Sequence, residues 1–347
     1  MISRMKLLGF VASVIRSIVS PHRLVSAQAV GAPGGAAASC ASRPQASATL
    51  TRGAPRRVTM PVALVTGCSS GIGLATALHF ARERYDVWAG VRDPAGATEL
   101  RESLEREQLP IRLVQLDVND TASVDGGVGE VFAKAGAIDV LVNNAGIGGG
   151  GPIEEVPVDW VKSLFETNYF GVIRMIRAVL PSMRDRRGGA IVNVSSIGGR
   201  VAVAGHGHYC AVKHALEAAS EALAQEVQGF GIRVAIVEPG VVVTPIFQKA
   251  RRFADPASPY AEHVRRLLLF YQVQMKLASQ PADAARVIFE AVTTREPRLR
   301  WLVGEDARRL DAGRRRMSDE EFIAGARPMP DAEYLAQMKQ RFGFDWQ

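Results

Sequence analysis

A serine, a tyrosine and a lysine stand at a spacing that suits proton transfer. Ser196 precedes Tyr209 by thirteen positions, and Lys213 follows Tyr209 by four. Positions four apart lie on one face of a helix, so a helix over 211–227 that begins near Tyr209 would point the phenol and the ammonium the same way. A nearby ammonium favours the phenolate and lowers the phenol pKa, which lets a tyrosine exchange a proton with an alcohol or carbonyl oxygen.

The segment before Ser196 is predicted to place the serine hydroxyl near the tyrosine and the lysine. The apolar run over 191–194 indicates a buried strand that ends in small polar residues, and a serine hydroxyl at such an end can hold the same oxygen. A lone Tyr-x-x-x-Lys pair is more often a surface tyrosine and lysine on an ordinary helix, because chance matches are common. The rest of the chain decides between the two interpretations.

A glycine-rich turn near residue 70 favours an anionic ligand. A predicted strand over 62–66 is followed by Gly67, Gly71 and Gly73 and then by a helical pattern over 74–84. Such a turn brings backbone N–H groups and a helix N-terminus to a pyrophosphate. The spacing is Gly-x-x-x-Gly-x-Gly rather than the Gly-x-Gly-x-x-Gly dinucleotide fingerprint, so a plain turn is the alternative.

The next predicted strand, over 87–91, ends at a residue pair that bears on the cofactor. An acidic residue at this position of a dinucleotide fold binds the ribose diol, whereas an arginine suits a 2′-phosphate. Val91 ends the strand and Arg92 follows it, which favours NADP(H). The competing interpretation makes Asp93 the diol-binding acid and NAD(H) the cofactor.

Polar residues follow the third and fourth predicted strands. The strand over 111–116 leads to Asp117, which could reach an adenine amino group or cap the helix that begins near Thr121. The strand over 138–142 leads to Asn143 and Asn144, which suit cross-strand hydrogen bonding and a close approach of the cofactor.

The middle of the chain adds an asparagine in a helical context. A long helix is predicted over 158–184, and Asn168 lies inside it, where asparagine is mildly unfavourable and needs a reason. The glycine run over 148–151 is expected to be flexible and to line a substrate entrance. Further strands are predicted over 232–237 and 299–303, and a helix over 281–292.

Strands and helices alternate, which predicts an α/β fold with a parallel sheet and helices on both faces. We expect one domain over 61–305 and a helical C-terminal extension over 306–347, where Ser318-x-x-Glu321 is a capping box. Residues 1–60 are expected to be a disordered, targeting or mis-called N-terminal segment, since Met60 directly precedes the first strand.

The charge distribution argues against nucleic acid and membrane partners. The formal charge is +7, but residues 1–60 carry eight of the 42 basic residues and none of the 35 acidic ones. The remainder has 34 basic and 35 acidic residues, a net charge of about −1, so a polyanion partner is not expected. The apolar stretch over 7–19 is too short for a membrane span, so no firm anchor is expected.

The three cysteines indicate neither a disulfide framework nor a metal site. Cys40, Cys68 and Cys210 lack metal-ligand spacing, and we expect a reducing, cytoplasmic environment unless residues 1–60 are a genuine organelle signal or a surface anchor. His206 and His208 are interpreted as loop or pocket residues rather than metal ligands.

With these pieces in order, the chain resembles the short-chain dehydrogenase/reductase family over roughly residues 61–300. The matching motifs, in chain order, are Thr66-Gly67-x-x-x-Gly71-Ile72-Gly73, Asn143-Asn144-Ala145-Gly146, Asn168, Ser196, Tyr209-x-x-x-Lys213 and Pro239-Gly240. The resemblance implies a Rossmann-type, doubly wound parallel sheet of about seven strands. It also implies hydride transfer between NAD(P)H and an alcohol/carbonyl pair, catalysed by a homodimer or homotetramer built on the helices that carry Asn168 and Tyr209.

The same resemblance implies a role for each catalytic residue. Ser196 would orient the substrate oxygen, and Tyr209 would be the acid/base. Lys213 would bind the nicotinamide ribose and lower the tyrosine pKa, and Asn168 would hold a water in a proton relay with that lysine. The cofactor contacts expected from the turn, the strand ends and the resemblance together are Gly67, Ser69, Ser70, Gly71, Ile72, Gly73, Arg92, Asp117, Val118, Asn144, Ala145, Gly146, Tyr209, Lys213, Pro239, Gly240 and Thr244.

Two other classes of function are weighed. One is a catalytically silent NADP(H)-binding regulator, against which the intact set of catalytic residues argues. The other is an epimerase or dehydratase on the same fold, which the glycine spacing and the short C-terminal part disfavour. Within the family, the segments 90–94 and 298–304 resemble the branch near 17β-hydroxysteroid and retinol dehydrogenases.

The segment after Thr244 bears on the substrate. It is apolar and aromatic over 245–247, at Phe253 and over 267–275, and in this family the corresponding segment covers the substrate. A buried hydroxyl without a partner costs about 1–3 kcal/mol, whereas burying hydrocarbon gains about 25 cal/mol per Å². We therefore expect a lipophilic alcohol or ketone, with packing against the protein body or another subunit as the alternative role of this segment.

Overall fold

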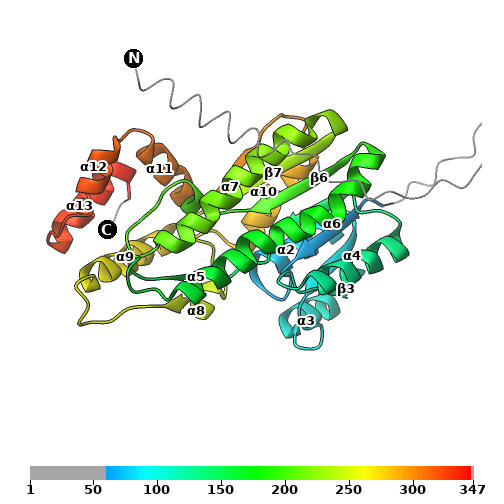
Figure 1. The fold of residues 1–347 in the computed structure, drawn as a ribbon, viewed down its shortest axis with the longest axis horizontal. Helices are drawn as coiled ribbons and strands as arrows, with labels where there is room; N and C mark the ends of the chain where they lie inside the picture. Colours follow the sequence, from blue (N-terminus) through cyan, green and yellow to red (C-terminus); the bar gives the residue numbers. More distant parts are fainter. Residues whose placement is uncertain (1–59, 345–347) are drawn as a thin grey trace, which may run out of the picture. The chain divides into compact units, whose positions relative to one another are not determined.

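A parallel sheet of seven strands organises residues 60–344, which are the residues that the computed structural model describes (Figure 1). The strand order is β3-β2-β1-β4-β6-β7-β9, and every neighbouring pair is parallel. The sheet strands are β1 (Val62–Thr66), β2 (Asp86–Val91), β3 (Ile111–Gln115), β4 (Val140–Asn143), β6 (Gly189–Val194), β7 (Ile232–Pro239) and β9 (Arg300–Val303). The predictions for the first 59 residues lie outside the described part of the chain.

The central strands are mostly apolar and almost entirely buried because helices cover both faces of the sheet. All residues of β1 and β4 are buried, as are the last five residues of β2 and of β6. A half-solvated strand would instead alternate between polar and apolar residues. The continuous apolar runs in the sequence are therefore the signature of this doubly wound sheet, and the predicted fold class is confirmed.

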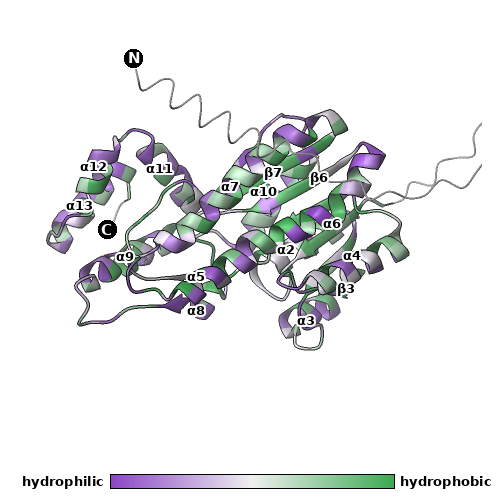
Figure 2. Cartoon of the chain, in the orientation of Figure 1, coloured by the Kyte–Doolittle hydropathy of each residue, from purple (hydrophilic) through white to green (hydrophobic). Residues whose placement is uncertain are grey.

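Two layers of helices enclose the sheet. One face packs against α2 (Gly71–Arg82), α3 (Thr98–Glu107) and α10 (Pro281–Thr293). The other packs against α4 (Thr121–Ala135), α6 (Gly171–Arg186) and α7 (Gly207–Val227), which lie over the sheet in Figure 1. Figure 2 shows the hydrophobic colouring gathered on the strands and the polar colouring on the outer helix surfaces.

A second group of elements lies between β7 and the C-terminus. It contains α8 (Ile246–Lys249), α9 (Ala261–Gln274), α11 (Glu305–Arg314), α12 (Asp319–Ala324) and α13 (Asp331–Phe342). All of these helices except α8 contribute to an apolar cluster that includes Ile197, Phe270, Leu310 and Phe344. The helices after β9 thus pack against the loop that follows Ser196, through Ile197 and Val201. Its predicted capping box is confirmed, with Ser318 and Glu321 bonding each other's backbone N–H groups.

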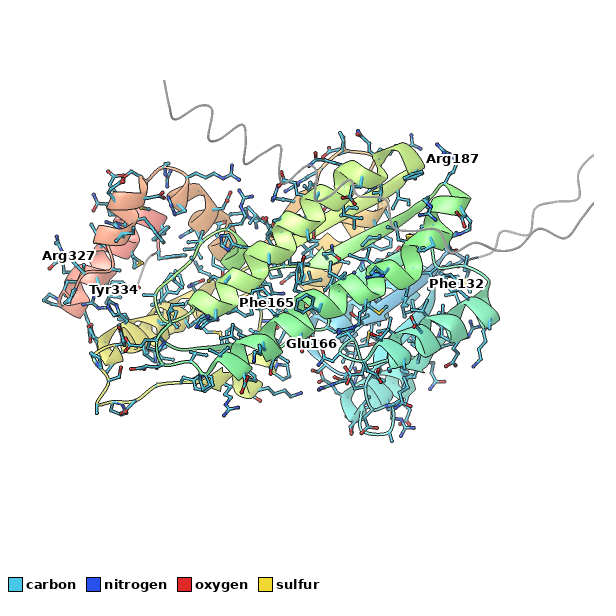
Figure 3. All side chains as sticks on the ribbon, in the orientation of Figure 1. Phe132, Phe165, Glu166, Arg187, Arg327 and Tyr334 are labelled. Atoms are coloured by element: carbon cyan, nitrogen blue, oxygen red, sulfur yellow. The ribbon has the colours of Figure 1, made fainter. Side chains whose placement is uncertain are left out.

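Three local predictions differ from the structure. The long helix predicted over 158–184 is α5 (Val158–Phe165), a π-helical turn η1 (Glu166–Phe170) and α6, and Figure 3 labels Phe165 and Glu166 at their junction. The helix predicted from Ala211 begins at Gly207. The glycine run expected to be flexible instead contains strand β5 (Gly149–Gly150), which pairs with β8 (Arg251–Arg252) in a separate two-stranded sheet.

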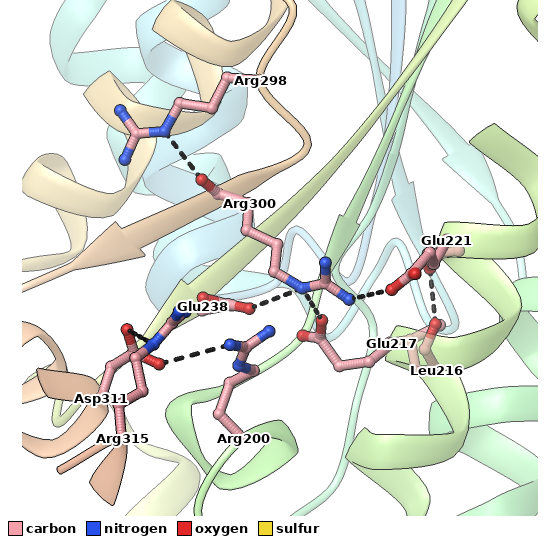
Figure 4. Close-up of polar contacts among 10 residues, drawn as sticks. Arg200, Leu216, Glu217, Glu221, Glu238, Arg298, Arg300, Asp311 and Arg315 are labelled. Carbon is pink, nitrogen blue, oxygen red and sulfur yellow. Dashed lines mark hydrogen bonds and ion pairs between the residues drawn. The ribbon is translucent and has the colours of Figure 1, made fainter. Parts of the chain in front are cut away.

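A charged cluster joins β7, β9 and α7 beside the sheet edge (Figure 4). The Arg300 Nε atom lies 3.0 Å from Glu217 Oε2 and 3.5 Å from Glu238 Oε1, and its Nη2 lies 2.6 Å from Glu221 Oε2. Glu217 and Glu238 are both buried, so two desolvated carboxylates share one guanidinium. Burial, and secondly the charge of Glu217, raise the pKa of Glu238 to about 8, while Arg200 and Arg300 oppose the shift.

This shift predicts how stability depends on pH. Because the pKa of Glu238 is raised in the folded protein, its contribution to stability is full below the unfolded value of 4.5 and is lost as the pH rises towards about 8. We expect the melting temperature of Glu238→Gln to fall less steeply than that of the wild type between pH 5 and 8, as measured by circular dichroism. Glu221→Gln is the matched control, since its exposed carboxyl has a lowered pKa and does not titrate in this window. Equal slopes for Glu238→Gln and wild type would contradict the assignment.

Candidate active site

The carboxyl ends of the parallel strands open onto one cavity of about 770 Å³. In an open α/β sheet, this edge is where the loops that follow successive strands meet and where ligands bind. The cavity takes its lining from the turns after β1, β2, β3, β4, β6 and β7 and from the wall formed by α8 and α9. Every predicted site residue lines it except Gly73.

The glycine-rich turn is built for close approach of a ligand. Gly67 adopts a φ of +72°, a conformation that side chains disfavour, and its N–H donates to Gly90 O at 3.0 Å. A Cβ on Gly73 would lie 2.3 Å from Gly67 O, so Gly73 is required for packing of α2 against the turn rather than for lining the cavity. Ser70 precedes α2 without bonding its N–H groups through the side chain, which leaves the helix N-terminus available to an anion.

Thr66, at the end of β1, fixes the loop after β4. Its Oγ1 accepts hydrogen bonds from the N–H groups of Asn144 and Ala145, each at 3.0 Å. The Asn144 side chain donates back to Thr66 O at 3.0 Å and lies 3.3 Å from Gly67 O. Asn144 therefore ties the two loops together, and its backbone, with Ala145 and Gly146, lines the cavity.

The other asparagine of the pair extends the predicted cross-strand contacts. Asn143 Nδ2 donates to Asn193 Oδ1 at 2.8 Å, joining β4 to β6. Asn193 Nδ2 in turn donates to Ser220 Oγ at 2.8 Å, which joins β6 to α7. This buried chain sets the position of the helix that carries Tyr209 and Lys213 relative to the strand that leads to Ser196.

The residues after β2 bear on the two cofactor interpretations. Arg92 is exposed and lines the cavity. The Asp93 carboxylate instead accepts a hydrogen bond from Ala95 N at 3.0 Å within its own turn, and Asp93 does not line the cavity. After β3, Asp117 and Val118 also line the cavity. The N-cap of α4 is Asp120, so the alternative reading of Asp117 as that cap is wrong.

Asn168 lies in the π-helical turn η1, and this turn is the structural reason for an asparagine inside a helix. π-Helical turns occur frequently at functional sites. The Asn168 side chain donates from Nδ2 to Ile147 O at 3.0 Å and accepts from Ile147 N at 2.9 Å. Both ends of the amide are thus held by the loop after β4, and the residue is 1% exposed.

Ser196, Tyr209 and Lys213 meet on one side of the cavity. The Ser196 hydroxyl accepts from Gly198 N at 3.0 Å, and Tyr209 lies in the first turn of α7. The Lys213 Nζ atom lies 5.8 Å from the Tyr209 ring centre and donates to Val194 O at 3.0 Å. The strand end and the helix face therefore bring the three groups together, as their spacing predicted.

The electrostatics differ from the simple expectation of a lowered tyrosine pKa. Burial raises the pKa of Tyr209 to about 12, and a contact with the Ser196 hydroxyl only partly opposes this. Burial also lowers the pKa of Lys213 to about 8, with Glu217 opposing the shift. The sequence predicted that the Lys213 ammonium lies beside the Tyr209 phenol. It did not show how far burial would desolvate the two groups, and desolvation is the main cause of both pKa shifts.

A buried aspartate, Asp306, holds the loop after β7, and the sequence analysis did not identify it. Asp306, in the first turn of α11, is fully buried, and its Oδ2 accepts a hydrogen bond from Val241 N at 2.6 Å. Pro239 and Gly240, which precede Val241, line the cavity together with Thr244. An acid three residues after a predicted strand carries no pattern that marks it, so only the structure reveals this contact.

The outer wall of the cavity is apolar and aromatic. The predicted wall residues that line it are Pro245, Ile246, Phe247, Phe253, Leu267, Leu268, Phe270, Tyr271 and Met275. Val273 and Leu269 do not line it, because they pack in the apolar cluster of the C-terminal helices. Most of the segment after Thr244 thus forms the wall, as expected.

His206 also lines the cavity, and its ring stacks on that of Tyr209. The ring centres lie 4.6 Å apart and the planes differ by 6°.

Among residues 60–344 no group of three or more His, Cys, Asp or Glu side chains could hold a metal ion. No helix in that range is long and apolar enough to cross a membrane.

Comparisons with known proteins agree with this geometry. The family profile described as short chain dehydrogenase matches residues 61–255. Retinol dehydrogenase 8 of Bos taurus is 37% identical over 71% of this chain and 81% of its own length. The 17-beta-hydroxysteroid dehydrogenase type 1 of Mus musculus is 32% identical over 69% of this chain and 72% of its own length.

A solved structure of ElxO with NADP bound is also similar. It is 26% identical, covers 71% of this chain and 97% of its own length, and superimposes with a TM-score of 0.60. The predicted likeness to the retinol and 17β-hydroxysteroid dehydrogenase branch is confirmed by the two curated relatives. The chain belongs to the short-chain dehydrogenase/reductase family and is an oxidoreductase of that family.

Proposed function

We propose that this enzyme transfers a hydride between NADP(H) and a lipophilic alcohol/carbonyl pair, with Tyr209 as the acid/base. The observation that carries the proposal is the meeting of Ser196, Tyr209 and Lys213 on one side of a cavity whose other end has a glycine-rich turn. NADP(H), when bound, supplies or accepts the hydride. The chain's own residues bind the two reactants, exclude water and move the proton.

The cofactor end of the cavity fits a dinucleotide. The close approach at Gly67 and the open N-terminus of α2 suit a pyrophosphate, and Asp117 and Val118 border the expected adenine position. On the nicotinamide side, Ala145, Gly146, Pro239, Gly240 and Thr244 would flank the ring. Lys213 would hold the ribose while its ammonium stays close to the phenol.

Proton transfer is assigned to the Tyr209 hydroxyl. A phenol with a pKa near 12 is protonated at neutral pH, so it can donate to the oxygen of a carbonyl as that oxygen gains negative charge. In the reverse direction the same group accepts the proton, and the Lys213 ammonium favours the phenolate. Ser196 would hold the substrate oxygen. Because the Asn168 amide is committed to Ile147, the water-holding role would fall to the backbone around η1.

A catalytically silent regulator would not require this arrangement. Its cofactor site could persist without a phenol, a hydroxyl and a buried ammonium around one point of the cavity. Measurable turnover with a ketone and NADPH would exclude that alternative.

An oligomer built on the helices that carry Asn168 and Tyr209 remains a prediction. Val158 and Phe170, on α5 and η1, are 69% and 47% exposed, and their burial by a second copy would be favourable. Sedimentation velocity would measure the state.

The first prediction tests the acid/base. Tyr209→Phe removes the hydroxyl and keeps the ring, so we expect kcat/KM to fall by about 10²–10⁴-fold, while NADPH binding measured by fluorescence is retained. Tyr85→Phe is the matched control, because this tyrosine packs against Phe80 and Phe289 outside the cavity. Near-wild-type turnover of Tyr209→Phe would show that another group moves the proton.

A second prediction concerns cofactor choice. Arg92 can clamp a 2′-phosphate with charge-assisted hydrogen bonds, so Arg92→Asp should lower kcat/KM for NADPH by about 10–100-fold and change that for NADH far less. Arg101→Asp makes the same charge change on exposed α3, away from the cavity lining. Wild-type efficiency with NADH equal to or above that with NADPH would sink the proposal.

A third prediction concerns the substrate. The apolar wall gains about 25 cal/mol for each Å² of hydrocarbon that it buries, and it offers a polyol few hydrogen-bonding partners. In a panel of steroid, retinoid, medium-chain and sugar substrates, we expect the highest kcat/KM for a lipophilic compound. The printed names of two relatives, a retinol dehydrogenase and a 17-beta-hydroxysteroid dehydrogenase, support this class. A preference for a small polyol over every lipophilic compound would overturn it.

A further inference from the structure

His206 is a half-buried titratable side chain in the cavity that the mechanism above does not use. It lies directly before α7, and its imidazole covers one face of the Tyr209 ring in a nearly parallel stack. Its Nδ1 atom lies 2.7 Å from the hydroxyl of Tyr271, which comes from α9 on the opposite wall. His206 therefore joins the helix of the acid/base to the wall that faces the substrate.

The protonation of this imidazole follows from its surroundings. Burial lowers the pKa of His206 to about 4, so the ring is neutral near pH 7 and one nitrogen carries its hydrogen. The Tyr271 hydroxyl has Nδ1 as its one hydrogen-bonding partner among the described residues. Because Nδ1 is the acceptor that the described residues offer to the Tyr271 hydroxyl, we assign this hydrogen bond as a donation from Tyr271 to Nδ1, which places the imidazole hydrogen on Nε2.

The other ring nitrogen, Nε2, has no hydrogen-bonding partner among residues 60–344. Within residues 60–344, His206 makes its hydrogen bond through Nδ1, and the side chain lines the cavity beside Tyr209. An N–H group at this place would be satisfied by an acceptor on the substrate. The stack on Tyr209 places such an acceptor close to the reacting carbon.

We propose that His206 is a specificity-determining residue whose Nε2–H donates a hydrogen bond to a second oxygen of the substrate, and that Tyr271 fixes the tautomer which makes this possible. The inference rests on the proposed function. The substrate class that it names is a lipophilic ketone or alcohol with a further oxygen acceptor a few bonds from the reacting carbon, such as a 3-oxo ester.

The test compares two probes of similar length, ethyl 3-oxodecanoate and 2-undecanone, with NADPH as the cofactor. The wild type should prefer the 3-oxo ester. His206→Phe keeps an aromatic ring for the stack and removes the donor, so kcat/KM for the ester should fall by about tenfold or more, while that for the simple ketone changes less than about threefold. NADPH binding by fluorescence should be unchanged.

Two further variants separate recognition from support of the Tyr209 ring. His206→Gln retains an N–H donor and should recover part of the preference for the ester. Tyr271→Phe removes only the hydroxyl that holds Nδ1, and it should reduce the preference while the protein melts near the wild-type temperature.

Each alternative result is decisive. Equal losses on both probes in His206→Phe, or weakened NADPH binding, would mean that His206 supports the ring or the cofactor and would overturn the proposal. Unchanged selectivity in His206→Phe or Tyr271→Phe would overturn it as well. If the wild type reduces neither probe and no compound of the substrate panel, the proposed function itself fails, which is distinct from a failure of the role of His206.

Discussion

The Thr66 hydroxyl is the contact on which the geometry of the cavity depends. Its oxygen accepts hydrogen bonds from two successive N–H groups after β4. The side-chain amide of Asn144 donates in turn to the carbonyl oxygens of Thr66 and Gly67 at the end of β1. The turn that would hold the pyrophosphate and the loop that would flank the nicotinamide are therefore fixed relative to each other. From that loop, Ile147 holds Asn168, so the same set of bonds extends to the π-helical turn.

A second set of contacts places the groups proposed to transfer the proton. The chain from Asn143 through Asn193 to Ser220 crosses two strands and reaches α7 with each hydrogen bond at 2.8 Å. Lys213 and Glu217 lie one turn apart on that helix, and Glu217 also binds Arg300 of β9. The buried ammonium is thus linked through one carboxylate to the charged cluster at the sheet edge. The negative charge of Glu217 partly offsets the effect of burial, which lowers the pKa of Lys213.

The sequence predicts the fold well because the burial of the strands leaves a direct trace in it. The run Val62–Val65 is apolar and ends in Thr66, and the observed strand Val62–Thr66 has the predicted bounds. The positions of the candidate site residues follow from the strand ends, the glycine-rich turn and the resemblance to the family. The π-helical turn at Asn168 was not predictable, because it depends on tertiary contacts with Ile147. Asp306 and the pairing of His206 with Tyr271 depend on elements that lie 65 residues away in the chain, and no local pattern records them.

The apolar wall comes from one continuous stretch between β7 and α10, and that stretch adds no strand to the seven-stranded sheet. Most of the residues proposed to bind the dinucleotide, and those proposed to move the proton, come from other segments, although Gly240 and Thr244 precede the wall in this stretch. Apart from Tyr271, which contacts His206 beside Tyr209, residues 246–277 are therefore largely separate from the proposed proton-transfer groups, and substitutions there are expected to change which molecules enter. Such modularity gives one scaffold the capacity to diversify, and it marks this stretch as the place to redesign when a new substrate is wanted.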